Sequence, residues 1–318
     1  RQLFLVILAV CCGAVYRTKI GNDRPIIGIL SQEQSSHLKT KYSKENYTSY
    51  IAASYVKLVE SAGARVVPIM IGKDRTYYNN LMRQINGVLL PGGATYFNQS
   101  NGFADAGQHI YEIAQQMNDG GDYFPIFGIC LGFELLIVLA SGREVGSTKQ
   151  KFVPDSQNSK MFQYATPEVV RILTEEKVTV NAHKFCITTD NLNAHNLSRY
   201  WRVNSFSNDN KGLQFISSIE NKRYPFYGVQ FHPEKPAFEW KPAKLYPHSE
   251  NAIVVNRYFM DFFTREARKS DHSFENVSEE NECLIYNYVP TYTGLVGSAY
   301  LQCYFFEPRV SESSLTGI

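Results

Sequence analysis

The sequence lacks an excess of charge of either sign. Its 318 residues include 32 Lys or Arg and 30 Asp or Glu, which gives a formal net charge of +2. It contains no run of lysines and no basic stripe. Because nucleic acids and anionic membranes attract proteins through clustered positive charge, we expect neither as a partner.

The sequence also lacks the cysteine patterns of metal sites and of disulfide-rich scaffolds. Two of its six cysteines, Cys11 and Cys12, lie in an N-terminal apolar run, and the other four are widely spaced. There is no CxxC pair and no Cys/His cluster at zinc spacing, so we expect no metal and no other cofactor. Cys283 and Cys303 could pair with each other, and the sequence leaves this open.

The sequence has no apolar run long enough to span a bilayer, and its N-terminal apolar run is also too short. Residues 1–15 open on Arg1, continue apolar, and include small residues at Gly13 and Ala14. This pattern predicts a secretory signal peptide cleaved near residue 14, and therefore a soluble, lumenal or secreted protein. Four N-x-[ST] triplets support a secretory route and predict N-glycosylation at Asn46, Asn98, Asn196 and Asn276.

What the sequence does contain is an alternation of short apolar runs with longer amphipathic ones. Buried strands are expected at 25–32, 65–70, 86–93, 124–130 and 225–231, and helices at 49–63, 77–84, 104–121, 131–142 and 249–269. This order predicts an α/β fold, with a mostly parallel central sheet flanked by helices on both faces.

The rest of the chain fits around this alternation. Residues 178–188 and 213–220 are expected to be antiparallel strands. We place one catalytic domain at 24–270 and treat 271–318, where the composition changes, as its C-terminal extension. That extension could be an extra hairpin or an interface arm.

A cysteine stands at one junction between a predicted strand and a predicted helix. The sequence GICLG, residues 128–132, fits the G-x-nucleophile-x-G elbow, with Cys130 as the nucleophile. Glycines on both sides allow strained backbone and a close approach of strand and helix. The start of the next helix is expected to lower the pKa of the Cys130 thiol. A lone cysteine is more often a buried structural residue, but the elbow favours the nucleophile.

A second motif, His-Pro-Glu, follows the last strand of the predicted sheet. Because His232 and Cys130 both follow strands, they could meet above the same sheet edge. Glu234, two residues on, would face the same side and could hold the imidazole in one tautomer. Alone, the motif could be a surface turn; with Cys130 it predicts a Cys-His-Glu triad.

An oxyanion hole needs two backbone N–H groups near this triad. The N–H of Leu131 follows the nucleophile directly. Gly93, or else Gly92, could supply the second from the end of the strand in VLLPGG, although a plain turn there is the alternative.

In this order, the three motifs resemble the class I glutamine amidotransferase-like superfamily, and within it the γ-glutamyl hydrolases of peptidase family C26. The resemblance covers residues 24–269 and rests on RPIIGILSQE, YIAASYVKLVESAGARVVPI, GVLLPGG, FGICLGFELL and GVQFHPEK. It implies a flavodoxin-like three-layer sandwich and a homodimer. It also implies hydrolysis of γ-glutamyl bonds in folylpoly-γ-glutamates and antifolate polyglutamates, in lysosomes or after secretion, without a cofactor.

The resemblance also implies roles for single residues. Cys130 would be the nucleophile, His232 the general base and then acid, and Glu234 the orienting carboxylate. His183, in NAHKF, matches a histidine of these hydrolases and could be structural, substrate-binding or catalytic.

Such a substrate is a polyanion, so cations are expected near the cleft. Lys235, Arg143 and Lys149 are the candidates, although each could equally be an ordinary surface charge.

Two other functions remain open on the sequence. The same triad would serve a glutaminase that feeds ammonia to a synthase, but the predicted signal peptide and the sequons disfavour a cytosolic partner. A secreted relative that only binds its ligand would be expected to have lost part of the triad, whereas Cys130, His232 and Glu234 are all present.

Overall fold

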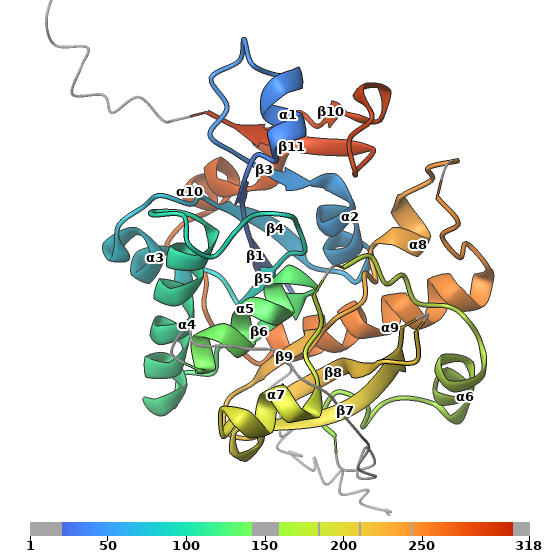
Figure 1. Cartoon of the computed structure of the whole chain (residues 1–318). Helices are drawn as coiled ribbons and strands as arrows, with labels where there is room; N and C mark the ends of the chain where they lie inside the picture. The colour runs from blue at the N-terminus through green and yellow to red at the C-terminus, as the bar shows by residue number, and fades with distance from the viewer. Residues whose placement is uncertain (1–20, 142–158, 184, 210, 243, 308–318) are drawn as a thin grey trace, which may run out of the picture.

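The computed structural model describes residues 21–141, 159–183, 185–209, 211–242 and 244–307 (Figure 1). The predicted signal peptide at 1–15 and the candidate cations Arg143 and Lys149 lie outside these ranges.

A seven-stranded sheet forms the centre of the molecule, in the order β4-β1-β5-β6-β9-β8-β7. Its strands are β1 (Ile26–Leu30), β4 (Arg65–Ile69), β5 (Gly87–Leu90), β6 (Ile126–Ile129), β7 (Trp201–Asn208), β8 (Gln214–Asn221) and β9 (Phe226–Val229). The five strands from β4 to β9 pair in parallel, and β8 runs antiparallel to both of its neighbours. The predicted fold class, α/β with a mostly parallel central sheet, is confirmed.

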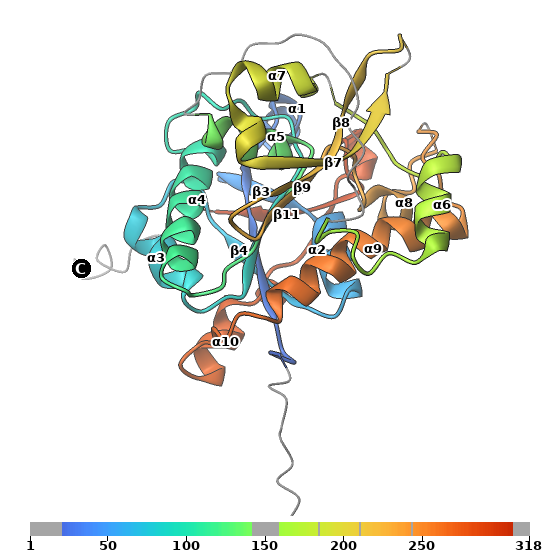
Figure 2. The same ribbon diagram turned by 90° about the horizontal axis from the view of Figure 1, so that it is seen from below.

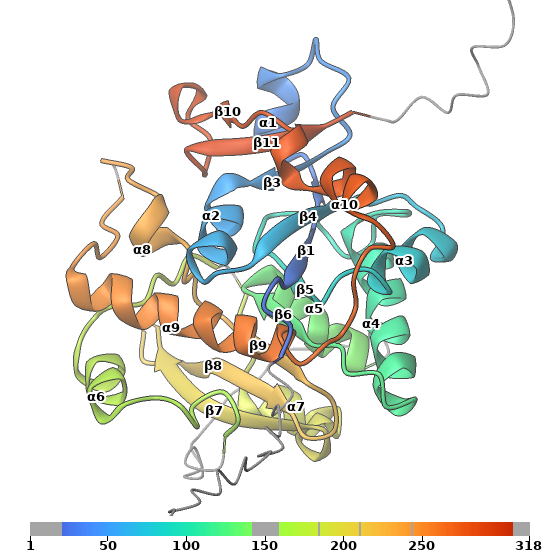
Figure 3. The same ribbon diagram turned by 180° about the vertical axis from the view of Figure 1, so that it is seen from behind.

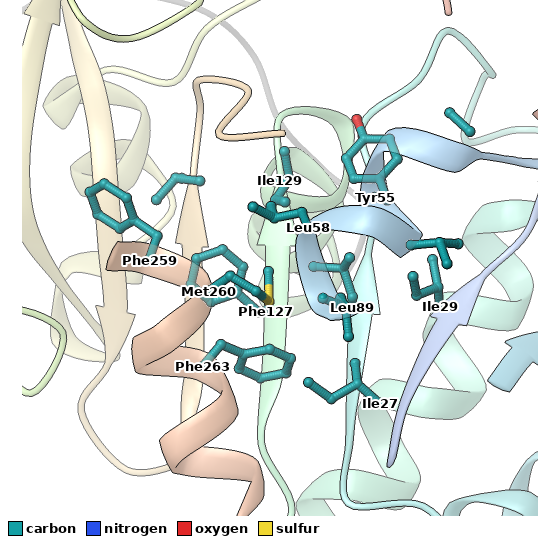
Figure 4. Packing of buried hydrophobic residues seen from close by; sticks show 14 of the residues in the cluster. Ile27, Ile29, Tyr55, Leu58, Leu89, Phe127, Ile129, Phe259, Met260 and Phe263 are labelled. Atoms are coloured by element: carbon teal, nitrogen blue, oxygen red, sulfur yellow. The ribbon is translucent and has the colours of Figure 1, made fainter. Parts of the chain in front are cut away.

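Helices cover both faces of this sheet. Alternate residues of each strand point to opposite sides, so one strand can pack against helices on both faces. Ile27 and Ile29 pack in one apolar cluster with helices α2 (Ala53–Ser61) and α9 (Glu250–Ala267), as Figure 4 shows. On the other face, β1 packs against α3 (Arg75–Met82), α4 (Phe103–Asp119) and α5 (Leu131–Ala140). Figure 2 shows α3 and α4 on one side of the sheet and α9 on the other.

The C-terminal segment joins a second, four-stranded antiparallel sheet in the order β10-β11-β3-β2 (Figure 3). Its strands are β2 (Gln32–Glu33), β3 (Ser49–Ala52), β10 (Thr291–Tyr292) and β11 (Gln302–Phe306). Of the two alternatives for the extension, the structure therefore shows the hairpin, and β11 pairs with a strand from the N-terminal third of the chain.

The remaining elements are short. Within the described residues they are α1 (Ser36–Lys41), α6 (Pro167–Glu175), α7 (Thr189–Ala194), α8 (Lys235–Phe238), α10 (Val277–Cys283) and 3-10 turns at Leu197–Arg199, Ile285–Asn287 and Gly294–Val296.

Two of the predicted elements differ in the structure. The helix expected from Ser49 begins at Ala53, because residues 49–52 are all buried and pair with β11 as a strand. No strand forms among the described residues 178–183 and 185–188. Val180 O accepts from His232 N and Ile187 O from Ile216 N, so these residues make isolated backbone bonds to two different segments.

The pairing considered for Cys283 and Cys303 is not formed. Cys303 is a buried free thiol in the first apolar cluster, whereas Cys283 packs against the second. The two residues therefore lie in different layers of the fold.

Candidate active site

Cys130 lies between β6 and α5 in a strained turn, with φ 50° and ψ −106°. A non-glycine residue with positive φ is rare and marks a backbone held by its surroundings. A Cβ on Gly132 would overlap the carbonyl oxygen of Leu90, and a Cβ on Gly128 would lie 2.6 Å from Gly132 O. The two glycines thus permit the close packing that the elbow requires.

His232 and Glu234 follow β9, which is the parallel neighbour of β6, so they lie at the same carboxyl edge as Cys130. Nδ1 of His232 is 2.8 Å from Oε1 of Glu234, and both side chains are buried. A Cβ on Gly92 would be 2.8 Å from His232 Cε1 and 3.1 Å from Cys130 Cβ. The cysteine and the imidazole therefore contact the same glycine.

The carboxylate of Glu234 fixes the tautomer of the imidazole. Burial would raise the pKa of Glu234, but the adjacent His232 and Lys235 reverse this and hold it below its ordinary value. An ionised carboxylate can only accept a hydrogen bond, so Nδ1 of His232 carries the proton. Nε2 is then left unprotonated and available as a base.

The expectation of a lowered thiol pKa is wrong. Burial, with the negative charges of Glu134 and Glu234, raises the pKa of Cys130 to about 12, against the smaller opposing effects of the Leu131 N–H and Lys235. Burial also lowers the pKa of His232. The resting site therefore holds a neutral thiol and a neutral imidazole.

The two candidate oxyanion donors come from the turn at Cys130 and from the loop after β5. The N–H of Leu131 favours the thiolate of Cys130 and so opposes part of the rise in its pKa. Gly93 lies in the loop after β5, where Gln32 Nε2 donates to Pro91 O at 3.1 Å and to Gly92 O at 3.2 Å. A Cβ on Gly93 would overlap Gln32 Oε1, so Gln32, which sequence reasoning missed, packs directly against this loop.

Sequence reasoning also missed Gln230 and Glu134, which lie near the sulfur of Cys130. Gln230 Nε2 donates to Glu134 Oε1 at 3.1 Å and lies 3.9 Å from Cys130 Sγ. Burial raises the pKa of Glu134 to about 7. The sequence held a signal for both residues, because Gln230 is two residues before His232 and Glu134 is one helical turn from Cys130.

Lys235 does not lie where a substrate-binding cation was expected. Its side chain is buried, with Nζ 3.8 Å from Glu234 Oε1 and 4.4 Å above the ring of Tyr300. Its charge therefore faces the carboxylate of Glu234 and an aromatic ring rather than open solvent.

His183 lies close to the site, since the charge of His232 contributes to lowering its pKa after the larger effect of burial. Its own ring nitrogens bond elsewhere, Nδ1 to Phe185 O at 2.7 Å and Nε2 to Asn181 Oδ1 at 3.3 Å. The structure therefore gives it no hydrogen bond to the triad residues.

Three further observations bear on the classes of function considered. Asn46, Asn98, Asn196 and Asn276 are all exposed. Within the described ranges, no group of three or more His, Cys, Asp or Glu side chains is arranged to hold a metal ion. In the same part of the chain, no helix combines the length and the apolar character needed to cross a membrane.

The fold and the site define a class of protein. A cysteine in a nucleophile elbow, next to a histidine–carboxylate pair at the carboxyl edge of a parallel sheet, is the arrangement of a cysteine-type hydrolase. The family model for peptidase C26 matches residues 25–234, and the chain belongs to this family.

Curated relatives match almost the whole chain. A gamma-glutamyl hydrolase of Rattus norvegicus is 42% identical over 295 residues, which cover 90% of each chain. A gamma-glutamyl hydrolase of Homo sapiens is 39% identical, over 89% of this chain and 90% of the relative. Gamma-glutamyl hydrolase B of Dictyostelium discoideum is 37% identical, over 86% and 80%.

Proposed function

We propose that this hydrolase cleaves γ-glutamyl bonds in folylpoly-γ-glutamates and antifolate polyglutamates through a thioester on Cys130. The observation that carries the proposal is the Nδ1–Oε1 contact of 2.8 Å between His232 and Glu234, at the sheet edge that also holds Cys130 in its elbow. The relatives named gamma-glutamyl hydrolase, over about nine-tenths of the chain, support the choice of bond.

The proposed first half-reaction forms the thioester. His232 Nε2 takes the thiol proton as Sγ of Cys130 attacks the γ-carbonyl carbon, and Glu234 stabilises the imidazolium. The N–H groups of Leu131 and Gly93 hold the oxyanion. When the tetrahedral intermediate collapses, the C–N bond breaks and His232 gives its proton to the leaving amine.

In the second half-reaction a water molecule replaces the amine. His232 removes a proton from the water as it attacks the thioester carbonyl. Collapse of this second tetrahedral intermediate breaks the C–S bond, and His232 returns its proton to the sulfur of Cys130. The product leaves as a γ-carboxylic acid and becomes a carboxylate when it gives its remaining proton to solvent.

The neutral resting state supports proton transfer in concert with attack. With its pKa raised to about 12, the thiol of Cys130 is protonated at neutral pH, so no stable thiolate waits for substrate. A base of lowered pKa, such as His232, is unprotonated over the same range and can accept the proton.

A glutaminase-type amidotransferase is the alternative function, since the same triad would release ammonia from glutamine. The relatives favour the hydrolase, because their names state gamma-glutamyl hydrolysis. We also propose a secreted or lysosomal, N-glycosylated homodimer. Exposed side chains at all four sequons are compatible with glycosylation.

Product analysis after incubation with pteroylpentaglutamate tests the proposed function. The purified chain should shorten the polyglutamate and release no ammonia from glutamine. Cys130→Ala should abolish the shortening, whereas Cys283→Ala, on α10, should retain it. Ammonia release with an intact polyglutamate would instead assign the chain to the glutaminases, and turnover by Cys130→Ala would remove Cys130 as the nucleophile.

A further inference from the structure

A tyrosine from the C-terminal extension reaches the candidate active site. Tyr300 lies between β10 and β11, outside the family match at 25–234, and is 5% exposed. Its hydroxyl donates to Gly92 O at 3.3 Å and lies 3.4 Å from the hydroxyl of Tyr55. Tyr55, on α2 at the upper end of the cluster in Figure 4, lies with Oη 3.3 Å from His232 Nδ1.

One arrangement of the protons satisfies all of these contacts at once. Nδ1 of His232 carries a proton because it faces the carboxylate of Glu234, so Tyr55 Oη can only accept from it. The proton of Tyr55 is then free to go to Tyr300 Oη. The single proton of Tyr300 is left for the carbonyl oxygen of Gly92.

That carbonyl belongs to the peptide whose N–H is the second oxyanion donor. The described chain contains no cis peptide, and in a trans peptide the C=O and N–H point in opposite directions. A group that holds Gly92 O therefore also sets the direction of the Gly93 N–H. This peptide lies between two glycines, Gly92 and Gly93. Because glycine has no Cβ, the peptide can rotate more freely than one between other residues.

Tyr300 is well placed to hold it because its own position is fixed on several sides. Its N–H donates to Ser298 Oγ at 3.2 Å, and its carbonyl accepts from Thr293 Oγ1 at 2.8 Å. The ammonium of Lys235 sits 4.4 Å above its ring. Only Gln32, at 3.2 Å, is a further described side-chain donor to the same carbonyl.

We propose that Tyr300 is a positioning residue that sets the Gly92–Gly93 peptide, and with it the second donor of the oxyanion hole. The proposal rests on the function proposed above, and it gives the C-terminal extension a part in catalysis without contact with substrate.

Tyr300→Phe tests this, because it keeps the ring over Lys235 and removes only the hydroxyl. Loss of one hydrogen bond that acts in the transition state should lower kcat about tenfold, with KM within about twofold of the unchanged chain. Alkylation of Cys130 by iodoacetamide forms no oxyanion, so its rate should stay within about twofold. Tyr292→Phe, half-exposed on β10, is the matched control and should change neither quantity.

The outcomes of these measurements distinguish a failure of the Tyr300 inference from a failure of the proposed function. Polyglutamate turnover by the unchanged chain with an undiminished kcat in Tyr300→Phe would overturn this inference and leave the proposed function standing. A parallel fall in kcat and in the alkylation rate would also overturn it, because it would indicate a general disturbance of the site. Absence of turnover by the unchanged chain would remove the proposed function and this inference together.

Thermal unfolding of Tyr300→Phe shows whether the variant is folded. If it is not, Gln32→Met removes the other side-chain hydrogen bond to Gly92 O and should give the same selective loss of kcat. An unchanged kcat in Gln32→Met would then overturn the inference.

Discussion

At the scale of single residues, burial outweighs the helix dipole at Cys130. A helix N-terminus contributes roughly 0.3–1 kcal/mol to an adjacent anion, which is less than one pKa unit. The thiol pKa instead rises from 9.0 to about 12, because burial and two nearby carboxylates all disfavour the thiolate. The local pattern of strand, cysteine and helix indicates the effect of the helix dipole. It gives no information on burial or on the two nearby carboxylates.

Glu134 offers a direct test of this electrostatic balance. Above its pKa of about 7 the carboxylate is charged and disfavours the thiolate of Cys130. Glu134→Gln removes that charge, so iodoacetamide should alkylate Cys130 faster than in the unchanged chain at pH 8 and at a similar rate at pH 5.5. Equal rates at both pH values would show that Glu134 has no such effect.

The same group makes stability depend on pH. Its folded pKa of about 7 exceeds the ordinary 4.5, so the folded state binds the proton more tightly. The stabilising contribution is full below pH 4.5 and is lost as pH rises through 7. The free energy of unfolding of Glu134→Gln, relative to the unchanged chain, should therefore increase between pH 5 and pH 8, by at most about 3 kcal/mol.

At the scale of secondary-structure elements, the elbow depends on how closely α5 approaches β5. Gly132→Ala would place Cβ against the carbonyl of Leu90, which is backbone and cannot rotate away. We expect a loss of ~2 kcal/mol or more in the free energy of unfolding, although alanine is the better helix former.

A second helical glycine provides the control for this prediction. At Gly107, on α4, a Cβ would meet the end of the Leu135 side chain, at 2.5 Å, and that side chain can move. Gly107→Ala should therefore remain within about 1 kcal/mol of the unchanged chain. Similar stabilities for the two variants, measured by denaturant unfolding, would show that backbone contact at Gly132 is not limiting.

The elements that were predicted correctly share a local cause. Strands such as β1 and β6 are continuously apolar because they are buried on both faces, and that pattern is visible without knowing their neighbours. β3 is a strand because it pairs with β11, which lies some 250 residues further along the chain. No window around Ser49 contains that partner, so local propensity alone favoured a helix.

The same distinction holds for the site. Cys130, His232 and the PGG turn were found because each stands directly after a recognisable strand. Tyr300 follows no such pattern, and its hydroxyl reaches Gly92 only through the packing of the C-terminal extension. Its contribution could not be read from the sequence, since the residues around it indicate a hairpin and nothing about what that hairpin contacts.

At the scale of the whole molecule, the first part of the C-terminal extension is joined to the edge of the central sheet by ion pairs. Glu280, on α10, pairs with Arg24 at 3.0 Å and also with Arg65. Figure 3 shows α10 next to β4, at the edge of the central sheet. The extension that carries Tyr300 is thus held by contacts far from the active site.

Asn86 also joins the start of the central sheet to the C-terminal part of the chain, and its side chain is buried, with 1% exposed. Its Oδ1 accepts from Ile26 N at 2.8 Å, and its Nδ2 donates to Ser270 O at 3.1 Å and His272 O at 2.9 Å. One side chain therefore satisfies backbone groups of β1 and of the segment that follows α9. It lies just before β5, at the amino edge of the sheet, whereas Cys130 lies at the carboxyl edge.

Asn86→Ala should separate stability from catalysis. It leaves three backbone groups without this partner, so the free energy of unfolding should fall by about 2–4 kcal/mol, because each buried unsatisfied group costs about 1–3 kcal/mol. Asn80→Ala, at an exposed position on α3, should stay within about 0.5 kcal/mol. At temperatures where Asn86→Ala remains folded, its kcat should match the unchanged chain, since the carboxyl edge is intact. A stable variant would show that Asn86 is dispensable for joining the two segments, and a folded variant with low kcat would show that the amino edge also controls the position of the active site.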